Sequence, residues 1–590
     1  MLKYIGISFR TYGGNMKKTV SLLLVLSMLL GCMLTLASCG EPEDGGAMIQ
    51  VYLGNEVFDF DPTDYYTDSN AEQVLSLMFE PLFRVNKKGK LEMATAEDYD
   101  VDEEDRKIVI TLRETYWSDD VRVKAADFVY AWGERLLNPN LPNPAATLLY
   151  DIENAAAVKS GIGTVSDIAV KATDIYEITI TYREGADVDQ LLRNLASVAT
   201  SPARQDVVEK APTYWSKSVN TWVFNGPFKI KNYDHGLGEF TLDRNLGYHQ
   251  TPDTVNYVKE VTPHALVGFV TAPGEAIEVS YSDLESKTVF YLADAPLSVR
   301  TENAKNATVV DDTSVLSYVF NTTKPLFANK NVRLALSLAI DREAVAKLIG
   351  FGKAANGFLP DICGGAGSSL ISATAARAAA EELLSKVDFT GLSKSFTIKV
   401  DNNEESVEVA KLVAAAWNDL GFDVTVVALD PIETKISTDP TNTLTIYDSG
   451  LQVLVKEASY GNREDFDVIG LDWQLYSTDS FAALAAFSSS MSGLGVDFST
   501  QEVRKNISGW KSADFDYYIS MAYHASGAEK DKLLAEAEKL LCEESPIIPI
   551  VFNQSFAFVS TELSNVKTDY YGNFIFTEVK QKNYKDYLED

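Results

Sequence analysis

The sequence predicts an α/β protein built from two or three domains. Segments with the two-residue periodicity of strands and segments with the 3.6-residue periodicity of helices follow each other throughout, with no evident internal repeat. Residues 39–590 are too many for one hydrophobic core, and chains of this length divide into domains. Hydrophobic residues make up 46% of the chain, which indicates a globular protein.

The first half of the chain alternates short strands with single helices. Residues 47–60 alternate apolar and polar side chains, and Asp61-Pro62 ends this strand with a turn. Helices are predicted at 71–79 and 125–137, each with an apolar stripe, and Asn138-Pro139 stops the second. Short β-rich runs predict further strands at 82–85, 107–113, 168–171, 176–182, 229–233 and 239–244.

Capping residues mark the helices of the second half. Two helical stretches are expected within 331–349, where Asp341 can cap the second by accepting early backbone N–H groups. A helix over 407–420 is expected to end at Gly421, because glycine favours the C-cap conformation. A strand at 422–429 follows.

The last predicted pair of elements is a helix at 530–542 and a strand at 547–552. Pro549 lies inside that strand and has no N–H to donate to a neighbour. Prolines of this kind are found on edge strands or at bulges, and we expect an edge strand here.

The first 46 residues predict an export signal and a tether. A basic start, Met16-Lys17-Lys18, precedes the uncharged apolar stretch 19–36. Leu36-Ala37-Ser38-Cys39 then has the lipobox pattern of bacterial lipoproteins. We expect residues 1–38 to be a signal peptide, lipid to be attached to Cys39, and the acidic, Gly-rich residues 39–46 to be a flexible tether.

Three alternatives for this segment remain open. Cys32 ends a weaker lipobox, but cleavage there would leave apolar residues 33–36 at the new terminus. The apolar stretch could also stay as an uncleaved anchor, and Met16 could be the true start. Since no later stretch reaches about 18 uncharged apolar residues, we expect the rest of the chain to lie outside the cell, held by lipid only.

The charge of the chain is strongly negative, at −32. This charge opposes binding to nucleic acid, favours solubility and weakly favours attraction of cationic ligands. Beyond Cys39, the cysteines are Cys363 and Cys542. They could form one disulfide outside the cell or remain two unpaired structural residues.

Recognisable catalytic motifs are absent from the sequence. None of the histidines, His235, His249, His264 and His524, lies in an HExxH pattern or at zinc-ligand spacing from a cysteine. There is no GxSxG and no GxxxxGK[ST] segment. We therefore expect neither an enzyme, nor a cofactor, nor a metal site.

Several motifs in order resemble one known family. LRETYWSDDVRVKAADFVYAWGERLLNPN, at 112–140, resembles the signature of the family 5 extracellular solute-binding proteins, the oligopeptide-binding components of ABC importers. Phe79-Glu80-Pro81-Leu82 precedes it. Later family-like segments are found at 225–228 (NGPF), 320–342, 465–473 and 545–552, so that the resemblance spans roughly 50–580.

The resemblance implies a two-lobed, periplasmic-binding-protein-like cleft fold of type II with an extra third domain. Lobe I is expected from 47–82, 200–296 and 550–590, the extra domain from 83–199, and lobe II from 297–549. The chain would cross between the lobes more than once, and closure would be a hinge motion. Residues 265–285 have no evident counterpart in the family and are interpreted as an insertion.

The resemblance also suggests ligand-binding residues. In peptide-binding members of this family, the Asp of a W-x-x-D motif, three residues after the Trp, pairs with the α-ammonium of the peptide. Trp473 matches that Trp, but Tyr476 stands at the Asp position, and Asp472 and Asp479 flank it. We expect Trp473 to line the cleft and Asp472 or Asp479 to supply the negative charge; alternatively, Trp473 is a core residue and both aspartates lie on the surface.

Other departures concern the same motif. The basic residue often found just before the Trp is replaced by Gly470 and Leu471, and a Cys common after it is Gln474.

The resemblance implies a lipid-anchored, monomeric receptor that passes peptides or peptide-like solutes to ABC permease subunits, most fittingly in a Gram-positive cell. Alternatives are a receptor for an oligosaccharide or a metal chelate, or a surface signalling or adhesion protein without transport.

Overall fold

The computed structural model describes residues 47–64, 66–67, 69–234, 239–250, 263–270, 280–365, 369–439 and 442–587. The chain falls into two compact units, 1–46 and 47–590, and only the second contains described residues. The predicted signal peptide, Cys39 and the tether lie outside them. Within the described ranges, no helix is both long and apolar enough to cross a lipid bilayer.

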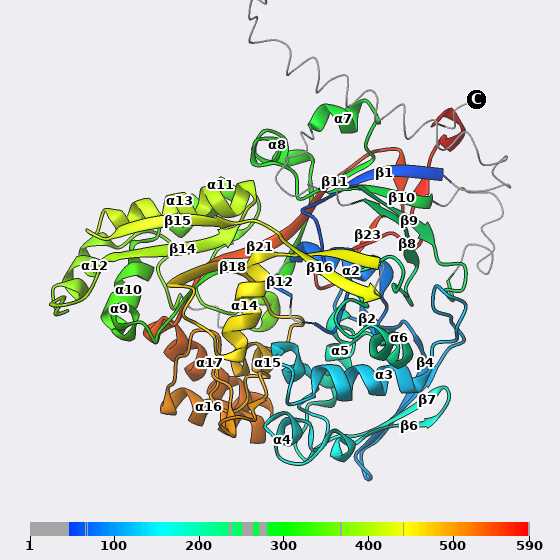
Figure 1. Ribbon diagram of the computed structural model, residues 1–590, viewed down its shortest axis with the longest axis horizontal. Coiled ribbons are helices and arrows are strands. Elements are labelled where there is room, and N and C mark those ends of the chain that lie inside the picture. The colour runs from blue at the N-terminus through cyan, green and yellow to red at the C-terminus, as the bar shows by residue number, and fades with distance from the viewer. Residues whose placement is uncertain are drawn as a thin grey trace, which may run out of the picture. The chain divides into compact units, whose positions relative to one another are not determined.

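One large mixed sheet runs through residues 47–590 (Figure 1). Its strand order is β15-β14-β18-β12-β21-β11-β1-β10-β9-β8, and β13 also pairs with β21. Neighbours within β15-β14-β18 and within β11-β1-β10 are parallel, and the other pairs are antiparallel. The strands are β1 Ala47–Gly54, β8 Phe228–Asp234, β9 Glu239–Arg244, β10 Pro263–Val270, β11 Tyr291–Ala293, β12 Thr308–Phe320, β13 Lys353–Ala354, β14 Ser395–Asp401, β15 Asp423–Leu429, β18 Val468–Gln474 and β21 Ile547–Val559.

Two long strands, β12 and β21, join the two halves of this sheet. They pair antiparallel over most of their length, and their register shifts between Asp311 and Val315 and again between Leu316 and Ser317. Pro549 lies opposite Ser317 at the second shift. The prediction of an edge strand is therefore wrong: β21 is central, and a β-bulge accommodates the proline without breaking a regular ladder.

A separate antiparallel sheet of four strands lies within the predicted extra domain. Helix α3, Ala125–Tyr130, packs on this sheet and continues as one wider π-helical stretch, Ala131–Leu136. Phe128 and Trp132 of the predicted apolar stripe are fully buried, which confirms the helix expected at 125–137. The strands are β4 Ala96–Asp102, β5 Lys107–Leu112, β6 Val170–Asp174 and β7 Glu177–Thr181. The other elements between residues 69 and 210 include α2 Ser69–Met78, β2 Phe83–Val85, β3 Leu91–Met93, α4 Ala155–Lys159, α5 Val188–Asn194 and α6 Gln205–Lys210.

Helices of the second half cover strands β14 and β15 (Figure 1). The capping predictions are confirmed: Asp341 Oδ1 accepts the Ala344 N–H at 3.0 Å, and Gly421, just past α13, has a φ of +87°. Trp417 of α13 lies fully buried against Tyr318 and Phe396. The helices are α8 Leu297–Asn303, α9 Pro325–Ala328, α10 Lys330–Ala339, α11 Arg342–Ile349, α12 Arg377–Leu384, α13 Glu404–Asn418, α14 Gly450–Tyr460, α15 Ser480–Ala485, α16 Ala513–His524 and α17 Gly527–Glu544.

Two of the family-like motifs contact each other. The Asn225 side chain donates to the carbonyl oxygen of Glu80 at 2.8 Å and accepts the Glu80 N–H at 3.1 Å. A Cβ on Gly226 would lie 2.5 Å from the carbonyl carbon of Met78, so that only glycine fits there. The Glu80 carboxylate is fully buried; burial would raise its pKa, but Arg84 and His249 lower it to about 2.

A third motif residue, Arg342, ties α11 to the sheet. Its guanidinium is buried and donates to the carbonyl oxygens of Pro549 at 2.8 Å and Ser337 at 3.0 Å. An arginine that donates to several backbone carbonyls satisfies groups that a bulge would otherwise leave unpaired. The motif at 320–342 therefore has a structural role at the Pro549 bulge.

Residues 265–285 and the cysteines can now be placed. Residues 265–270 belong to β10, which pairs with β1 and β9, so this part of the segment interpreted as an insertion is a strand of the main sheet. Residues 271–279 lie outside the described part, and α7, Tyr281–Glu285, follows them. Cys363 and Cys542 are both buried free thiols, and burial raises the pKa of each.

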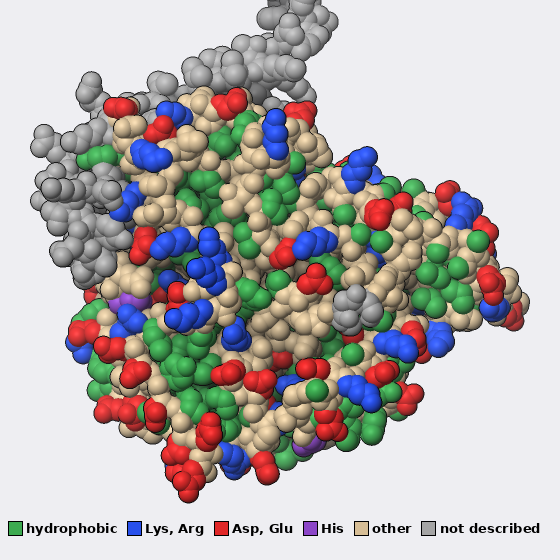
Figure 2. All heavy atoms as spheres, turned by 180° about the vertical axis from the view of Figure 1, so that it is seen from behind, with side chains coloured by type: hydrophobic (Ala, Val, Ile, Leu, Met, Phe, Trp, Pro, Cys, Tyr) green, Lys and Arg blue, Asp and Glu red, His purple; other side chains and the backbone are tan. Residues whose placement is uncertain are grey.

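The face opposite to that of Figure 1 carries charges of both signs (Figure 2). Lysine and arginine side chains alternate there with aspartate and glutamate, and hydrophobic side chains lie between them. The net negative charge of the chain therefore does not appear as a uniformly acidic coat on this face.

Candidate functional site

Asp472 and Trp473 follow each other on β18, and successive side chains of a strand point to opposite faces. Asp472 is partly exposed and lines a cavity, and its Oδ1 accepts a hydrogen bond from Asn553 Nδ2 at 2.7 Å. Trp473 is only 4% exposed, and its ring stacks on Phe487 with 4.8 Å between ring centroids. Trp473 is not among the residues that line the cavity and packs in the hydrophobic core.

The other two predicted site residues, Tyr476 and Asp479, are buried and are not among the residues that line the cavity. Tyr476 is buried with a φ of +62°, and its phenol oxygen donates to the backbone oxygen of Tyr66 at 2.6 Å. Asp479 caps α15 by accepting the N–H of Phe481 at 2.9 Å and also accepts Asn194 Nδ2 at 2.8 Å. Of the four predicted residues, the structure brings Asp472 to the cavity; ligand contact by any of them stays a prediction.

The absence of a basic residue before Trp473 has a steric reason. A Cβ on Gly470 would lie 2.0 Å from Cε1 of Tyr318 and 2.9 Å from Cγ1 of Val400. Tyr318 is fully buried on the neighbouring strand β12 and is packed against Trp417. No side chain fits at position 470 in this arrangement, so that the departure from the family pattern follows from how this core is packed.

The cavity beside Asp472 has a volume of about 870 Å³. Its walls come from the segment between β1 and α2, from β11 and the start of α8, from the ends of β14 and β17, from the first turn of α13, and from β18 and β21. β17, Asn442–Asp448, forms a separate hairpin with β16, Ile432–Asp439. Segments from both sides of the central strands β12 and β21 thus line one space large enough for a small peptide or a drug-sized ligand.

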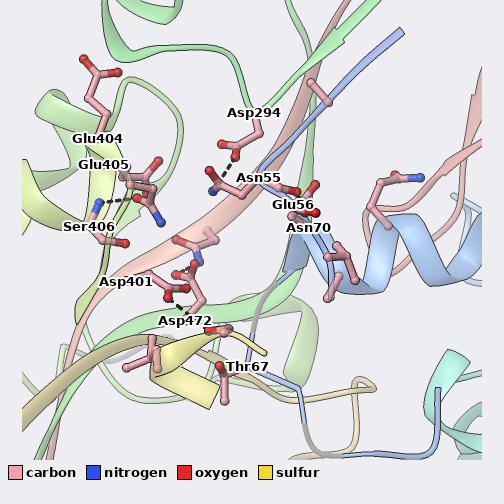
Figure 3. A pocket seen from close by; sticks show the side chains of 18 of the residues that line it. Asn55, Glu56, Thr67, Asn70, Asp294, Asp401, Glu404, Glu405, Ser406 and Asp472 are labelled. Carbon is pink, nitrogen blue, oxygen red and sulfur yellow. Dashed lines mark hydrogen bonds between the residues drawn. The ribbon is translucent and has the colours of Figure 1, made fainter. Parts of the chain in front are cut away.

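Most of the charged side chains that line this cavity are acidic. Among the described lining residues there are twelve carboxylates and one basic side chain, Arg300. Figure 3 shows Asp401 and Asp472 next to each other, with Asp294 across from them and Glu404 and Glu405 on a third side. The carboxylates are Glu56, Asp59, Asp61, Asp64, Asp294, Asp312, Asp401, Glu404, Glu405, Glu408, Asp448 and Asp472.

Ion pairs join opposite walls of the cavity on two sides. Lys217 pairs with Asp59 at 3.4 Å and also with Asp448, which lies at the end of the hairpin strand β17. Lys456 of α14 pairs with Asp64 at 2.5 Å. Burial would raise the pKa of Asp59, but Lys217 and Lys456 lower it below its ordinary value.

On the other side, helix α13 is joined to α8. Arg300 of α8 pairs with Asp294 at 2.6 Å and with Glu405 of α13. The backbone N–H of Leu297 donates to Glu404 Oε2 at 3.0 Å. These contacts connect segments that are more than one hundred residues apart and that face each other across the cavity.

A hydrogen-bonded chain leads from Asp472 to the register shift in β12. Asn553 Nδ2 of β21 donates to both Asp472 Oδ1 and Ser314 Oγ, and Ser314 Oγ donates to Asp312 Oδ1 at 2.8 Å. Asp312 is 4% exposed, and burial raises its pKa to about 6. Behind it lies Glu72, whose pKa burial raises to about 8.

Sequence reasoning missed most of the lining residues. Asp401 ends β14, which is parallel to β18 with Lys399 opposite Ile469, so that Asp401 and Asp472 lie at the same carboxyl-terminal edge of two neighbouring strands. Ligands of open α/β sheets bind at such edges. The acidic strand-to-helix junction at 401–405 is therefore the sequence signal that could have located this side of the cavity.

Over the residues that the structure describes, no group of three or more His, Cys, Asp and Glu side chains is placed to hold a metal ion. His249 donates or accepts at Glu80 in a buried structural cluster rather than in the cavity.

Comparison with known proteins defines the class of this chain. Residues 90–495 match the family described as bacterial extracellular solute-binding proteins, family 5, in its middle region. The chain belongs to the family 5 bacterial extracellular solute-binding proteins. This family is one of binding proteins rather than enzymes, and the family expected from the sequence is confirmed.

Relatives and solved structures cover nearly the whole chain. The dipeptide-binding protein DppE of Bacillus subtilis (strain 168) is 26% identical over 565 residues, which cover 91% of this chain and 94% of DppE. The periplasmic murein peptide-binding protein MppA of Escherichia coli (strain K12) is 28% identical over 495 residues, 81% of this chain and 82% of MppA. Haemophilus influenzae OppA in complex with RPPGFSPFR has a TM-score of 0.72 at 21% identity, covering 92% of this chain and 100% of that one, and confirms the two-lobed binding-protein fold.

Proposed function

We propose that this chain captures peptides or peptide-like solutes outside the cell and delivers them to the permease subunits of an ABC importer. The observation that carries the proposal is the cavity of about 870 Å³ beside Asp472, in a chain that belongs to a solute-binding family. The relatives DppE and MppA are named for binding a dipeptide and a murein peptide, and the related OppA was solved with a bound peptide. No reaction on this chain is part of the proposal.

Asp472 is the residue to which we assign the amino terminus of the ligand. It is partly exposed to the cavity, whereas Asp479 is engaged in capping α15. An α-ammonium that leaves water needs a counter-charge, because an unpaired buried charge costs several kcal/mol. Asn553 holds the Asp472 carboxylate in place from β21.

The assignment is tested by calorimetric titration with one peptide in two forms, free and N-acetylated. Asp472→Asn keeps the hydrogen bond from Asn553 but loses the charge, and it should weaken binding of the free peptide at least about tenfold, or 1.4 kcal/mol. It should leave the acetylated peptide unaffected. If acetylation and the substitution both leave the affinity unchanged, Asp472 does not bind the amino terminus.

Closure around the ligand is proposed to be a hinge motion of two lobes. Lobe I comprises 47–82, 200–296 and 550–590, lobe II comprises 297–549, and 83–199 form the extra domain. The boundary at 549–550 falls within β21, whose register against β12 shifts near that point. The ion pairs of Lys217 and Lys456 then join the two lobes across the cavity.

The receptor is proposed to be held on the outer face of the membrane by lipid on Cys39, in a Gram-positive cell, as a monomer. The basic start at 16–18, the apolar stretch 19–36 and the lipobox pattern that ends at Cys39 support this placement. Cys39→Ser should abolish labelling of the protein by a radioactive fatty acid in cells and release it into the medium. Unchanged labelling would contradict the assignment of Cys39.

A further inference from the structure

Ion pairs and one ring contact join opposite walls of the cavity beside the hairpin of β16 and β17. Lys456 Nζ lies 2.5 Å from Asp64 Oδ2 and 4.0 Å from Asp59 Oδ2. The rings of Phe58 and Tyr447 lie 6.3 Å apart between centroids. We call this group the clasp; its residues are Phe58, Asp59, Asp64 and Lys217 on one side, and Tyr447, Asp448 and Lys456 on the other.

Each side of the clasp is fixed to its own part of the chain. The Phe60 N–H donates to the backbone oxygen of Ser216 at 3.0 Å, and the Phe60 ring lies 4.9 Å from that of Trp222 between centroids. On the other side, Ser449 Oγ accepts the Gln452 N–H at 3.2 Å and caps α14, which packs on β14. In the proposed division of the chain, the first side belongs to lobe I and the second to lobe II.

Partial burial strengthens the ion pairs of the clasp. The side chains of Lys217 and Asp59 are each 13% exposed, and that of Lys456 is 29% exposed. Burial would lower the pKa of Lys456, but Asp64 and Asp59 raise it above its ordinary value, so that attraction outweighs the loss of hydration. Ion pairs on an open surface contribute little by comparison, because water screens both charges. The closed arrangement therefore gains attraction that separated walls would lose.

The clasp is also part of the cavity wall. Phe58, Asp59, Asp64 and Asp448 line the cavity, so that separation of the two sides would open the cavity there. Every contact of the clasp joins groups of the chain itself. It therefore favours the closed arrangement with or without a ligand.

We propose that the clasp holds the two lobes closed, so that a ligand enters and leaves when its ion pairs separate. The inference rests on the proposed function, because it concerns the hinge closure of that receptor. Salt screens partly exposed ion pairs, so that raising the salt concentration shifts the population towards the open form. The clasp thus makes the rate of ligand release depend on ionic strength.

Spin labels on the two sides of the clasp measure its opening in the full chain. Val219→Cys and Tyr460→Cys provide exposed labelling positions, and the labelled chain without these substitutions gives the background from the native cysteines. Bound ligand is removed beforehand by unfolding in guanidinium chloride and refolding. We expect one short distance between the labels in about 50 mM NaCl, and a second, longer distance whose share grows towards about 1 M NaCl. An unchanged distance in high salt would overturn the proposal.

Matched variants assign the closure to the clasp. Lys217→Met combined with Lys456→Met should lower the ratio of closed to open protein at least about tenfold in low salt and remove its salt dependence. Lys386→Met removes a lysine from an exposed ion pair with Glu382 and should leave the ratio unchanged. A double variant that stays as closed as the wild type would overturn the proposal. Because these measurements need no ligand, a failure to bind any peptide would overturn the proposed function and leave the clasp standing.

Discussion

Replacing Glu72 by glutamine should make the stability of the protein less dependent on pH. Glu72 lies on α2 and is 2% exposed, and its carboxylate accepts hydrogen bonds from Asn573 and Gln474. Burial raises its pKa from 4.5 to about 8, and these hydrogen bonds oppose the rise only in part. Between these two pH values the folded protein keeps a proton on Glu72 that the unfolded chain has lost.

The sign of the effect follows from the raised pKa. The proton stabilises the folded protein fully below pH 4.5, and this contribution is lost as the pH rises through about 8. From pH 5 to pH 7.5 the free energy of unfolding falls by about 3 kcal/mol through Glu72 alone, by proton linkage. In a folded unit of this size, about 3 kcal/mol corresponds to about 3 °C in Tm.

The assay is thermal unfolding of the wild type, Glu72→Gln and the control Glu97→Gln at pH 5 and pH 7.5. Glutamine is neutral and keeps an oxygen acceptor, so that Glu72→Gln should match the wild type at pH 5 and exceed its Tm by about 3 °C at pH 7.5. Glu97 is exposed on β4, and Glu97→Gln should have the same Tm as the wild type at both pH values. Burial raises the pKa of Asp312 and of Asp569 to about 6, so both residues also lower the stability as the pH rises, equally in all three proteins. An equal Tm change at both pH values would refute the reasoning.

Three further substitutions test the packing around the site. Gly226→Ala should lower the stability by about 2–3 kcal/mol in urea unfolding, because its Cβ would strike the Met78 backbone; wild-type stability would contradict the steric argument. Trp473→Ala should lower the free energy of unfolding by about 3–5 kcal/mol, whereas Trp473→Phe should keep the ligand affinity of the wild type. A loss of affinity in Trp473→Phe at an unchanged Tm would place Trp473 in contact with the ligand. Asn553→Ala should weaken peptide binding about tenfold, since Asp472 loses its positioning hydrogen bond, and an unchanged Kd would separate Asn553 from the site.

Local sequence signals predicted elements well where one residue decides the outcome. Asp341 and Gly421 cap their helices as expected, because capping depends on a side chain and on backbone within one turn. Pro549 misled the prediction because a bulge between two strands far apart in sequence makes room for it. Strand pairing of this kind depends on tertiary packing that no local pattern encodes.

The candidate site was less predictable for the same reason. Motif spacing pointed to Trp473 and Tyr476, which the structure places in the hydrophobic core, whereas the adjacent Asp472 lines the cavity. Strand alternation decides this, and one residue of offset moves a side chain to the other face. Asp401 lies 71 positions before Asp472 and joins it only because β14 and β18 are parallel neighbours.

Native mass spectrometry of the protein purified from its own cells tests the central claim most directly, because ligands that remain bound in the cavity add their mass to the protein. The account predicts a ladder of added masses that tandem spectrometry resolves into short peptides. A single mass of a sugar or a chelate, or a ligand-free protein that binds no member of a peptide library, would contradict it.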